Sequence, residues 1–375
     1  MQTKKRNAPG AILFARDTAV AESPISTDGH TATAVHQMTV FAEFPDTQIT
    51  GVAVADRGRL FVNSPLWLEP HPVSVLEVRE DGSQRPYPDQ EWNTWREGMD
   101  PGNHFVCVQS VYIDRRNPDT LWILDPASPK LEGIVEGGPK LLEVDLKTDS
   151  VKRVIRFDET VAPKMSYLND VRVDAAQQWA YITESGTGAI IVVNLETNEP
   201  RRLLDYHPST KAEPGKELVI NGKSIKNPDG SVPKYHADGI ALSHDDQYLY
   251  YHALTGTRLY RIRTSVLQDP DLKPDKVFEE VENLGQTLVT DGMLFGPDGS
   301  IYHTALEQNA VVRWTPDGRL ETIVQSDDLQ WPDSLSWGPD GNLYVSTSQI
   351  NHMPKHNDGK STRTQPYRVF RIEMR

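Results

Sequence analysis

The sequence is poor in cysteine, in basic charge and in long apolar runs, and each shortage narrows what the chain can be. Cys107 is the only cysteine, so no disulfide bond can form within the chain. Its apolar neighbours predict a buried packing residue rather than a nucleophile. No apolar run approaches the length that a membrane-spanning helix needs, and we expect no membrane segment.

Basic residues are outnumbered by acidic ones, 39 against 53, which gives a formal net charge of −14. Nucleic-acid backbones and anionic membranes attract basic surfaces, so we expect neither of them as a partner. The expected partner is a small-molecule substrate or ligand, and we expect the protein to be a monomer.

Residues 1–35 are predicted to form a loose tail, and residues 36–375 a single domain. The basic start at Lys4–Arg6 is similar to that of a secretion signal, but the apolar stretch Ala11–Ala15 is too short and Arg16 follows it at once. We therefore expect a cytoplasmic protein. A periplasmic or secreted location stays open if a leader has been removed.

What the sequence does contain is a two-strand phrase that returns six times, at intervals of roughly 40–70 residues. Each phrase begins with a polar residue, continues as an alternating apolar strand and, after a turn, gives a second strand such as RLFVN or TLWILD. The six beginnings are Thr50-Gly51-Val52, Gln109-Ser110-Val111, Asn169-Asp170-Val171, Asp238-Gly239-Ile240, Asp291-Gly292-Met293 and Asp333-Ser334-Leu335. Such a period is typical of a β-propeller, which sets one blade per repeat around a central channel.

Each repeat also predicts two outer strands, so we expect an all-β, six-bladed propeller with four antiparallel strands in each blade. The outer pair of the sixth blade is divided between the two ends of the chain. Tyr367–Ile372 has the pattern of a third strand and His36–Phe41 that of a fourth. We therefore expect Thr39–Phe44 to lie beside Tyr367–Ile372 and to close the ring, which hides the edges of an open sheet.

Insertions interrupt the regular spacing of the predicted strands at four places. A fifth connection, Thr264–Lys276, is expected to hold a helical turn. Long loops in a compact fold are usually functional or disordered. The sequence does not fix whether the insertions share the channel mouth that carries the polar residues. The four insertions are Glu91–Asn103, Ser128–Gly138, Glu213–Lys234 and Ile350–Pro366.

The first residues of the six phrases are predicted to form a ring at one mouth of the channel. Carboxylates that point at a common axis repel one another unless they share a proton or a cation. A hard divalent cation, most plausibly calcium, suits carboxylate and amide oxygens. A water-filled channel closed by hydrogen bonds is the alternative. The ring consists of Thr50, Gln109, Asn169, Asp238, Asp291 and Asp333.

Few other residues point to chemistry. His252 and His303 follow their second strands at matching positions and are expected to pack or to lie in loops, although His303 is kept as a pocket candidate. His236 lies two residues before Asp238 and is the better candidate for a general base. The sequence contains no nucleophile elbow, phosphate loop, zinc-ligand spacing or dinucleotide fingerprint.

The amino-acid sequences of several segments resemble those of the major royal jelly protein/Yellow family. The matching segments include PKLLEVDLKT, YLNDVRVD, AYITESGTGAIIVVNLE, LYYHALTGTRLYRIRTSVL and LQWPDSLSWGPDGNLYVSTSQI, and they cover most of the chain after about residue 38. The resemblance implies a six-bladed propeller. It leaves the activity open, because the family includes pigmentation proteins linked to dopachrome conversion as well as binding and nutritive proteins. The cysteines of the secreted insect members are absent, which favours a microbial relative.

The expected fold is also similar to that of the SMP-30/gluconolactonase-like hydrolases. Those enzymes hold calcium with a Glu, one or two Asn and an Asp at the starts of inner strands. Carried over by position, this resemblance implies Asn169, Asp238 and Asp291 as metal ligands, with Asp238 where an Asn is usual. Thr50 stands where the Glu is expected, which removes one strong ligand, although Asp333 could compensate.

The leading hypothesis is therefore a calcium-dependent hydrolase of a small cyclic ester such as a sugar lactone. Asp238 or Asp333, or His236 nearby, would serve as general base. Two alternatives stay open: a non-catalytic carrier with an aromatic pocket near Trp331 and Trp337, and a dopachrome-type tautomerase, suggested by the family alone. The expected pocket residues are Thr50, Gln109, Asp170, Trp331 and His303.

Overall fold

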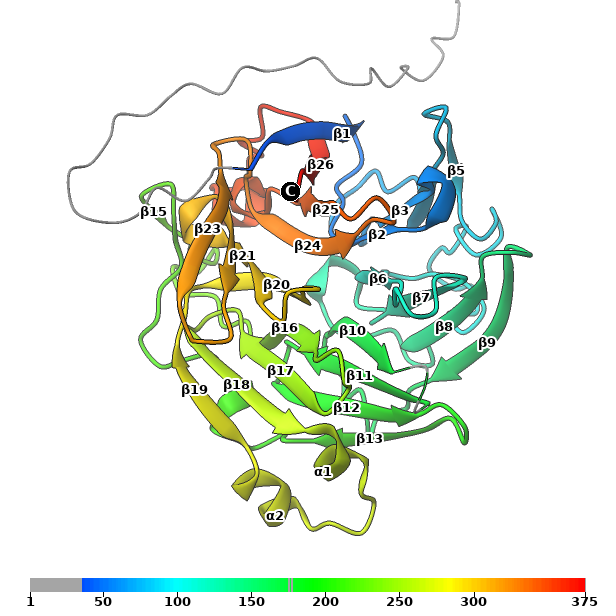
Figure 1. Ribbon diagram of the computed structural model, residues 1–375. Helices are drawn as coiled ribbons and strands as arrows, with labels where there is room; N and C mark the ends of the chain where they lie inside the picture. The colour runs from blue at the N-terminus through cyan, green and yellow to red at the C-terminus, as the bar shows by residue number, and fades with distance from the viewer. Residues whose placement is uncertain (1–35, 175, 177, 375) are drawn as a thin grey trace, which may run out of the picture.

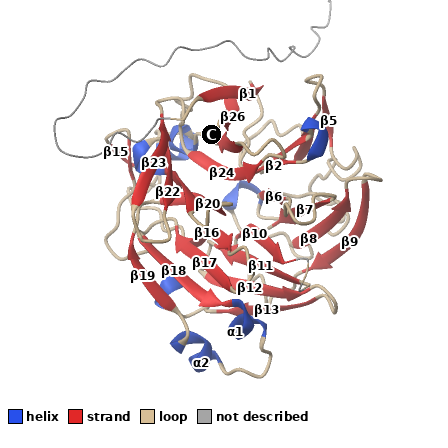
Figure 2. Ribbon diagram, in the orientation of Figure 1, coloured by secondary structure: helices blue, strands red, loops and turns tan. Residues whose placement is uncertain are grey.

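Six four-stranded antiparallel sheets surround a central channel in the computed structural model (Figure 1), and strands make up most of the regular structure (Figure 2). The structure describes residues 36–374 except 175 and 177, so the predicted tail 1–35 lies outside the described residues. The prediction of an all-β, six-bladed propeller is confirmed.

Blades 1 to 3 follow one another in the chain, and each runs from the innermost strand to the outermost. Blade 1 consists of β2 (Val52–Val54), β3 (Leu60–Asn63), β4 (Val75–Val78) and β5 (Gln84–Pro86). Blade 2 consists of β6 (Ser110–Tyr112), β7 (Thr120–Asp125), β8 (Lys140–Asp145) and β9 (Ser150–Arg156). Blade 3 consists of β10 (Leu168–Asp174), β11 (Trp179–Glu184), β12 (Ala189–Asn194) and β13 (Glu199–Leu203).

Blades 4 to 6 complete the circle. Blade 4 consists of β16 (Ala237–Leu242), β17 (Tyr248–Ala253), β18 (Arg258–Arg263) and β19 (Glu282–Gln286). Blade 5 consists of β20 (Thr290–Phe295), β21 (Ile301–Ala305), β22 (Ala310–Trp314) and β23 (Leu320–Gln325). Blade 6 consists of β24 (Pro332–Trp337), β25 (Leu343–Thr347), β26 (Tyr367–Ile372) and β1 (Met38–Phe44).

Smaller elements lie in the connections between strands. The expected helical turn is present as α1 (Thr264–Gln268) and α2 (Pro274–Glu279), which project from blade 4 in Figure 1. A two-stranded hairpin, β14 (Val219–Ile220) and β15 (Lys223–Ser224), occupies the third insertion. Short 3₁₀ helices are η1 (Asp56–Gly58), η2 (Pro129–Leu131), η3 (Pro208–Thr210), η4 (Leu306–Gln308), η5 (Ile350–His352) and η6 (Pro354–His356).

The ring closes in blade 6, where the first and last strands of the described chain pair antiparallel. Met38 lies opposite Ile372 and Phe44 opposite Tyr367, as predicted. The innermost strands contact one another in the order β2, β6, β10, β16, β20, β24 and back to β2. β1 therefore completes the four strands of blade 6, and the circle of inner strands has no gap.

The apolar core is divided among the spaces between neighbouring blades. One cluster joins blades 2 and 3 through residues such as Leu141 and Ile182, and another joins blades 3 and 4 through Ile190 and Tyr251. Cys107 is fully buried in a small cluster beside blade 2, and burial raises the pKa of its thiol. This is the packing role that its apolar neighbours predict.

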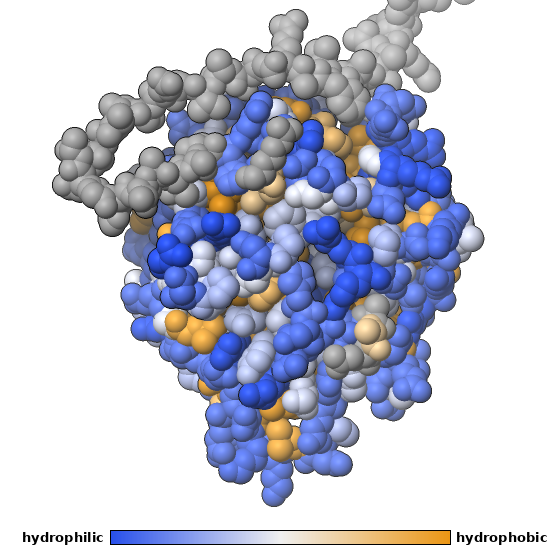
Figure 3. All heavy atoms as spheres, viewed as in Figure 1, coloured by the Kyte–Doolittle hydropathy of each residue, from blue (hydrophilic) through white to orange (hydrophobic). Residues whose placement is uncertain are grey.

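The outer surface is largely hydrophilic on the face seen in Figure 3, where apolar residues occur in small separate groups. Among the described residues, no helix has both the length and the apolar character that crossing a membrane requires.

Candidate functional site

A pocket of about 240 Å³ occupies one mouth of the channel. Four of the six predicted ring residues line it: Gln109, Asn169, Asp238 and Asp291. Residues from three of the four insertions line it, and the rings of Trp67, Tyr167, Tyr235 and Trp331 complete its wall. Three insertions therefore share the mouth that carries the polar residues, a point that the sequence left open.

A β-bulge explains how side chains at the start of an inner strand reach this pocket. In blades 3 to 6 the register shifts across two residues at this point, for example between Leu168 and Val171 and between Thr290 and Met293. A bulge sets two residues against one on the partner strand and so redirects a side chain. The first bulged residue of blades 3, 4 and 5 lines the pocket.

The second bulged residue lies against the next blade, which explains the glycines of the repeated phrase. A Cβ atom on Gly239 would lie 2.6 Å from the Asp291 carbonyl oxygen, and one on Gly292 would lie 2.2 Å from the Asp333 carbonyl oxygen. Any larger residue would force the inner strands apart at these two positions.

Hydroxyl groups on the second strands hold these bulges in place, and the sequence interpretation missed them. Thr304 Oγ1 accepts a hydrogen bond from the Gly292 amide at 2.8 Å and donates to the Asp333 carbonyl at 3.3 Å. Thr183 Oγ1 donates to the Asp238 carbonyl at 2.6 Å. Ser346 and Asn63 bridge neighbouring blades at the equivalent positions. The available signal was a polar side chain near the end of an apolar second strand, as in WAYITE and LYVST.

The floor of the pocket is formed by two neighbouring buried carboxyl groups, those of Asp238 and Asp291. Asn169 Nδ2 donates to Asp238 Oδ2 at 2.8 Å, and Trp331 Nε1 donates to Asp291 Oδ2 at 2.7 Å. Each carboxyl therefore has its own orienting donor. The side chains of these aspartates make no ion pair with a basic side chain of the described chain.

Burial raises the pKa of Asp238 and of Asp291 well above the usual value for an aspartate. The charge of Asp333 raises the pKa of Asp238 further, and the charge of Asp238 does the same for Asp291. Desolvation penalises the charged form of a carboxyl, and neighbouring like charges add to that penalty. The pocket floor therefore favours a shared proton or a bound cation.

Asp333 and Thr50 belong to the predicted ring but do not line the pocket. The Asp333 carboxyl is buried, and its Oδ2 has no hydrogen-bond partner among the described residues. Burial, and then the charge of Asp291, raises the pKa of Asp333 well above its usual value. Thr50 is fully buried; its Oγ1 donates to the Gln109 carbonyl at 3.1 Å and accepts from Asn63 Nδ2 at 2.8 Å. Thr50 therefore joins blades 1 and 2 instead of facing a ligand.

Asp170 was also expected in the pocket, but it is the second bulged residue of its strand and does not line it. Its carboxylate accepts from Ser110 Oγ at 2.7 Å and pairs with the Arg172 guanidinium at 2.9 Å. Arg172 also donates to the Met293 carbonyl at 2.6 Å and is almost fully buried. The pair ties blades 2, 3 and 5 together beneath the aspartates.

Neither histidine candidate reaches the pocket. The Nδ1 atom of His236 accepts a hydrogen bond from the Ala212 amide at 2.9 Å, and burial lowers the pKa of this imidazole. His303 is fully buried near His252, and burial lowers its pKa to about 3. His303 is thus a core residue, in agreement with the packing alternative, and it cannot act as a base on a ligand in this pocket.

The two tryptophans proposed for an aromatic pocket lie at opposite mouths. Trp331 lines the pocket described above, and its backbone adopts φ = 53°, a left-handed conformation that is unusual for a bulky residue. Trp337 lines a second pocket of about 230 Å³ whose other residues include Arg172. The interpretation that placed both rings at one site is corrected, because Trp331 directly precedes the inner strand β24 and Trp337 is its last residue.

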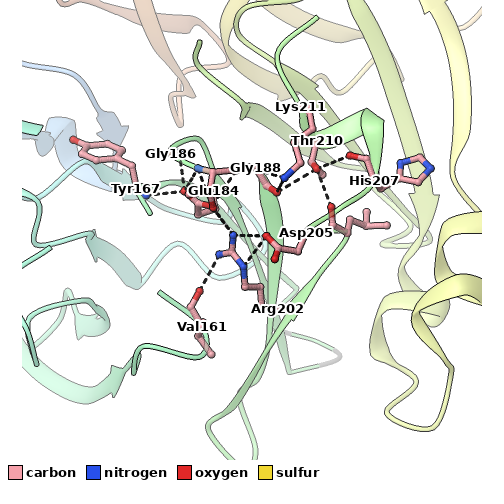
Figure 4. Close-up of polar contacts among 12 residues, drawn as sticks. Val161, Tyr167, Glu184, Gly186, Gly188, Arg202, Asp205, His207, Thr210 and Lys211 are labelled. Carbon is pink, nitrogen blue, oxygen red and sulfur yellow. Dashed lines mark hydrogen bonds and ion pairs between the residues drawn. The ribbon is translucent and has the colours of Figure 1, made fainter. Parts of the chain in front are cut away.

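A buried glutamate at the end of β11 shapes the pocket rim (Figure 4). Glu184 Oε1 accepts hydrogen bonds from the amides of Tyr167 and Gly186, both at 2.7 Å. Its Oε2 pairs with Arg202 at 2.8 Å, and Arg202 also binds Asp205 at 2.6 Å. Glu184 thereby fixes two backbone segments that line the pocket.

Blade 2 also has a buried, ion-paired acid at the end of its second strand. Asp125 ends β7 and forms a fully buried ion pair with Lys140 at 2.8 Å. Its carboxylate also accepts from the backbone amides of Val106, Cys107 and Ala127. Sequence reasoning missed both acids, although each is visible as the single charged residue that ends an apolar strand, in TLWILD and in WAYITE.

A chain of hydrogen bonds connects the pocket wall to its floor. Trp67 Nε1 donates to the Tyr167 hydroxyl at 2.9 Å, and that hydroxyl donates to Gln109 Oε1 at 2.8 Å. Gln109 Nε2 in turn donates to Asn169 Oδ1 at 3.4 Å. The aromatic wall and the amide ring are therefore held in fixed positions.

The residues present fit a divalent cation in part. Asn169, Asp238 and Asp291 present amide and carboxylate oxygens in one pocket, which is the ligand chemistry that calcium prefers. Thr50 supplies no ligand, and no group of three or more His, Cys, Asp or Glu side chains in the described part of the chain is placed to hold a metal. A bound cation would take its remaining ligands from water or substrate.

A protein-family model of the major royal jelly protein matches residues 106–369, well over half of the sequence. The chain belongs to the major royal jelly protein family. Major royal jelly protein 1 of Apis mellifera is 25% identical over 269 residues, which are 65% of this chain and 57% of the relative. Major royal jelly protein 3 of the same bee is 25% identical over 234 residues, 56% of this chain and 39% of the relative. This royal jelly family member thus aligns with only part of the length of the curated relatives that it matches.

Several solved enzyme structures share the fold of this royal jelly family member. A gluconolactonase from Xanthomonas campestris gives a TM-score of 0.55 at 11% identity, covering 91% of this chain and 90% of that one. A luciferin-regenerating enzyme gives a TM-score of 0.55 at 12% identity, with 90% and 95% covered. Virginiamycin B lyase from Staphylococcus aureus gives a TM-score of 0.51 at 12% identity, with 90% and 99% covered. At these identities the likeness shows the fold alone.

Proposed function

We propose that this protein is a hydrolase of a small cyclic ester, similar to a sugar lactone, and that its active site is the pocket floored by Asp238 and Asp291. The observation that carries the proposal is the pair of buried carboxyl groups, each oriented by its own donor and neither paired with a basic side chain. Unpaired buried carboxyls are costly, and a functional site is where such a cost is retained. The shared fold with a gluconolactonase supports this reaction class.

Asp238 is the proposed general base. Asn169 holds its Oδ2 at 2.8 Å and so fixes the carboxyl at the pocket floor. Asp238 would take a proton from the water that attacks the ester carbonyl, and the proton would pass to the ring oxygen as the ester bond breaks. The product is an open hydroxy acid. Asp333 is the less suitable base of the two because its carboxyl does not line the pocket.

Asn169, Asp238 and Asp291 are the proposed ligands of a divalent cation, most plausibly calcium. When bound, such a cation polarises the ester carbonyl and favours the developing negative charge. The absence of a ligand from Thr50 predicts weaker binding than a site with an additional glutamate would give.

The experiment is a screen of sugar and aryl lactones with purified protein, with calcium and with EDTA. We expect lactone opening that EDTA abolishes and calcium restores, and that Asp238→Asn lowers kcat/KM by about 100-fold or more, the usual contribution of a general base. Asp317→Asn serves as the matched control, since Asp317 is exposed and does not line the pocket. A wild-type protein that opens none of the lactones in either buffer would refute the hydrolase.

A carrier of small molecules is the second candidate. The aromatic wall of the pocket favours it, and that wall consists of Trp67, Tyr167, Tyr235 and Trp331. A carrier would bind its ligand in EDTA as well as in calcium and would leave it unchanged. Quenching of tryptophan fluorescence without turnover would select this candidate.

A further inference from the structure

Two lysines stand at the pocket without a carboxylate partner. Lys234 and Lys355 are the only basic side chains among the residues that line it, as Asp238 and Asp291 are the only acidic ones. Within the described chain, Lys234 makes no ion pair or hydrogen bond through its side chain, and Lys355 makes one hydrogen bond of 3.4 Å, to the Tyr235 hydroxyl.

The cations and the carboxyls occupy different depths of the pocket. Lys234 is exposed and ends the insertion before β16, and Lys355 is half-buried in η6 of the last insertion. Asp238 and Asp291 are only 3% and 7% exposed, at the starts of inner strands. The pocket thus has a basic rim and an acidic floor, with aromatic rings between them.

We infer that the natural ligand is a small, ring-bearing acid that enters with its neutral, ester-bearing end first. Resting on the proposed function, this assigns the substrate to the class of lactones that carry a carboxylate or a similar anionic substituent on the side facing Lys234 and Lys355. The aromatic wall would pack against the ring, and the rim lysines would bind the anion. The opposite orientation would place the ester carbonyl away from Asp238, the proposed general base, and would leave Lys234 and Lys355 without an anion to bind.

The charges of Lys234 and Lys355 should mainly change the rate at which an anionic ligand associates with the pocket. The protein as a whole is strongly negative, so it repels anions at long range, and the two lysines supply a local attraction that salt screens. Removing a charge from a rim typically changes the association rate and its salt dependence. A neutral ligand of the same shape should be insensitive to both.

The test uses a matched pair of probes, an aryl lactone and the same lactone with a carboxylate on its aromatic ring, together with the corresponding non-hydrolysable aryl carboxylic acid. We compare wild type with Lys234→Met, Lys355→Met and the double variant, which keep the aliphatic stems, and with Lys355→Arg, which keeps the charge. Lys360→Met is the matched control, because Lys360 is exposed on the same insertion and does not line the pocket.

We expect the carboxylated lactone to have about tenfold higher kcat/KM than the neutral one at low salt, and the double variant or high salt to remove that preference. Lys355→Arg and Lys360→Met should keep it. Equal kcat/KM for the two lactones in wild type, or a preference that survives in the double variant, overturns the inference and leaves the hydrolase standing. Lysine-dependent binding of the aryl acid without turnover of either lactone retains the anion site and refutes the hydrolase instead.

Discussion

The aspartates at the starts of the inner strands differ from the charged groups at the far mouth in whether they have a basic partner. At the far mouth, where Trp337 lies, Arg116 pairs with Asp114 and Asp246, and Arg172 pairs with Asp170. At the near mouth, the carboxyls of Asp238, Asp291 and Asp333 are buried side by side without a basic partner.

This difference separates charged groups that stabilise the fold from charged groups that are available to a ligand. A buried ion pair holds strands together, and removing one partner leaves an uncompensated charge. A buried carboxyl without a partner contributes nothing of that kind and lowers stability when it ionises. The far mouth is therefore built for cohesion, and the near mouth keeps groups that only a ligand, a cation or a proton can satisfy.

The largest expected effect comes from breaking the buried pair of Arg172 and Asp170, which ties blades 2, 3 and 5 together. Arg172→Met should lower the free energy of unfolding by about 3–5 kcal/mol, the range for a buried pair that loses one member. Chemical denaturation measures it. The matched control is Arg115→Met, because Arg115 is exposed at the same mouth and makes no ion pair within the described chain. A loss for Arg172→Met no larger than that of the control would show that this pair does not contribute to cohesion.

Next in size is the response of the near mouth to calcium. A cation that binds only the folded state adds about 2.7 kcal/mol at one hundred times its dissociation constant. The Tm should rise in calcium and fall in EDTA, and Asp291→Asn should blunt the rise. If the Tm of the wild type is the same in both buffers, the cation proposal fails and the shared proton remains.

The hydroxyl bridges below the near mouth give a smaller effect. Thr304→Val removes the acceptor for the Gly292 amide and the donor to the Asp333 carbonyl, which leaves two buried backbone groups unsatisfied. We expect a loss of about 1–3 kcal/mol in the free energy of unfolding. Thr322→Val on the exposed face of β23 is the control and should change it by less than about 0.5 kcal/mol.

The smallest expected effect is a change in the pH dependence of the free energy of unfolding. It distinguishes the near mouth from the far mouth most clearly. Burial raises the folded-state pKa of Asp238 above its ordinary 3.8, so its stabilising contribution is complete below pH 3.8 and is lost as the pH rises through the folded value. In metal-free buffer, Asp238→Asn should therefore be more stable than wild type, by on the order of 1 kcal/mol at alkaline pH. Denaturation at several pH values tests this.

Asp317→Asn provides the contrast for that experiment. A hydrogen bond from Thr315, and then one from Arg319, hold the pKa of the exposed Asp317 below its ordinary value, so its contribution has the opposite dependence on pH. It should give no gain at alkaline pH. A gain for both variants would mean that general relief of negative charge, and not the buried pair, explains the result.

The fold was predictable because the repeat and the closure are both visible as strand patterns. Six phrases gave six blades, and the patterns at Tyr367–Ile372 and His36–Phe41 gave the pairing that closes the ring. Both depend on alternation of apolar residues, which local sequence carries.

The site was predictable only in part, because its geometry depends on the bulges. A shared offset from the first apolar residue suggested six equivalent side chains, of which Gln109, Asn169, Asp238 and Asp291 line the pocket. The register shift occurs in blades 3 to 6, whereas β2 begins only at Val52, after the ring residue Thr50. A bulge is a relation between two strands, so a pattern along one strand does not reveal it.

The pairing of β1 with β26 also governs how the protein is made. Residues near 40 leave the ribosome early, but their partner strand is complete only at residue 372. At about 5–20 residues per second, the first strand waits roughly 15–70 seconds for its neighbour. Throughout that time the backbone groups of β1 have no strand to pair with, and the circle closes only when residue 372 has been made.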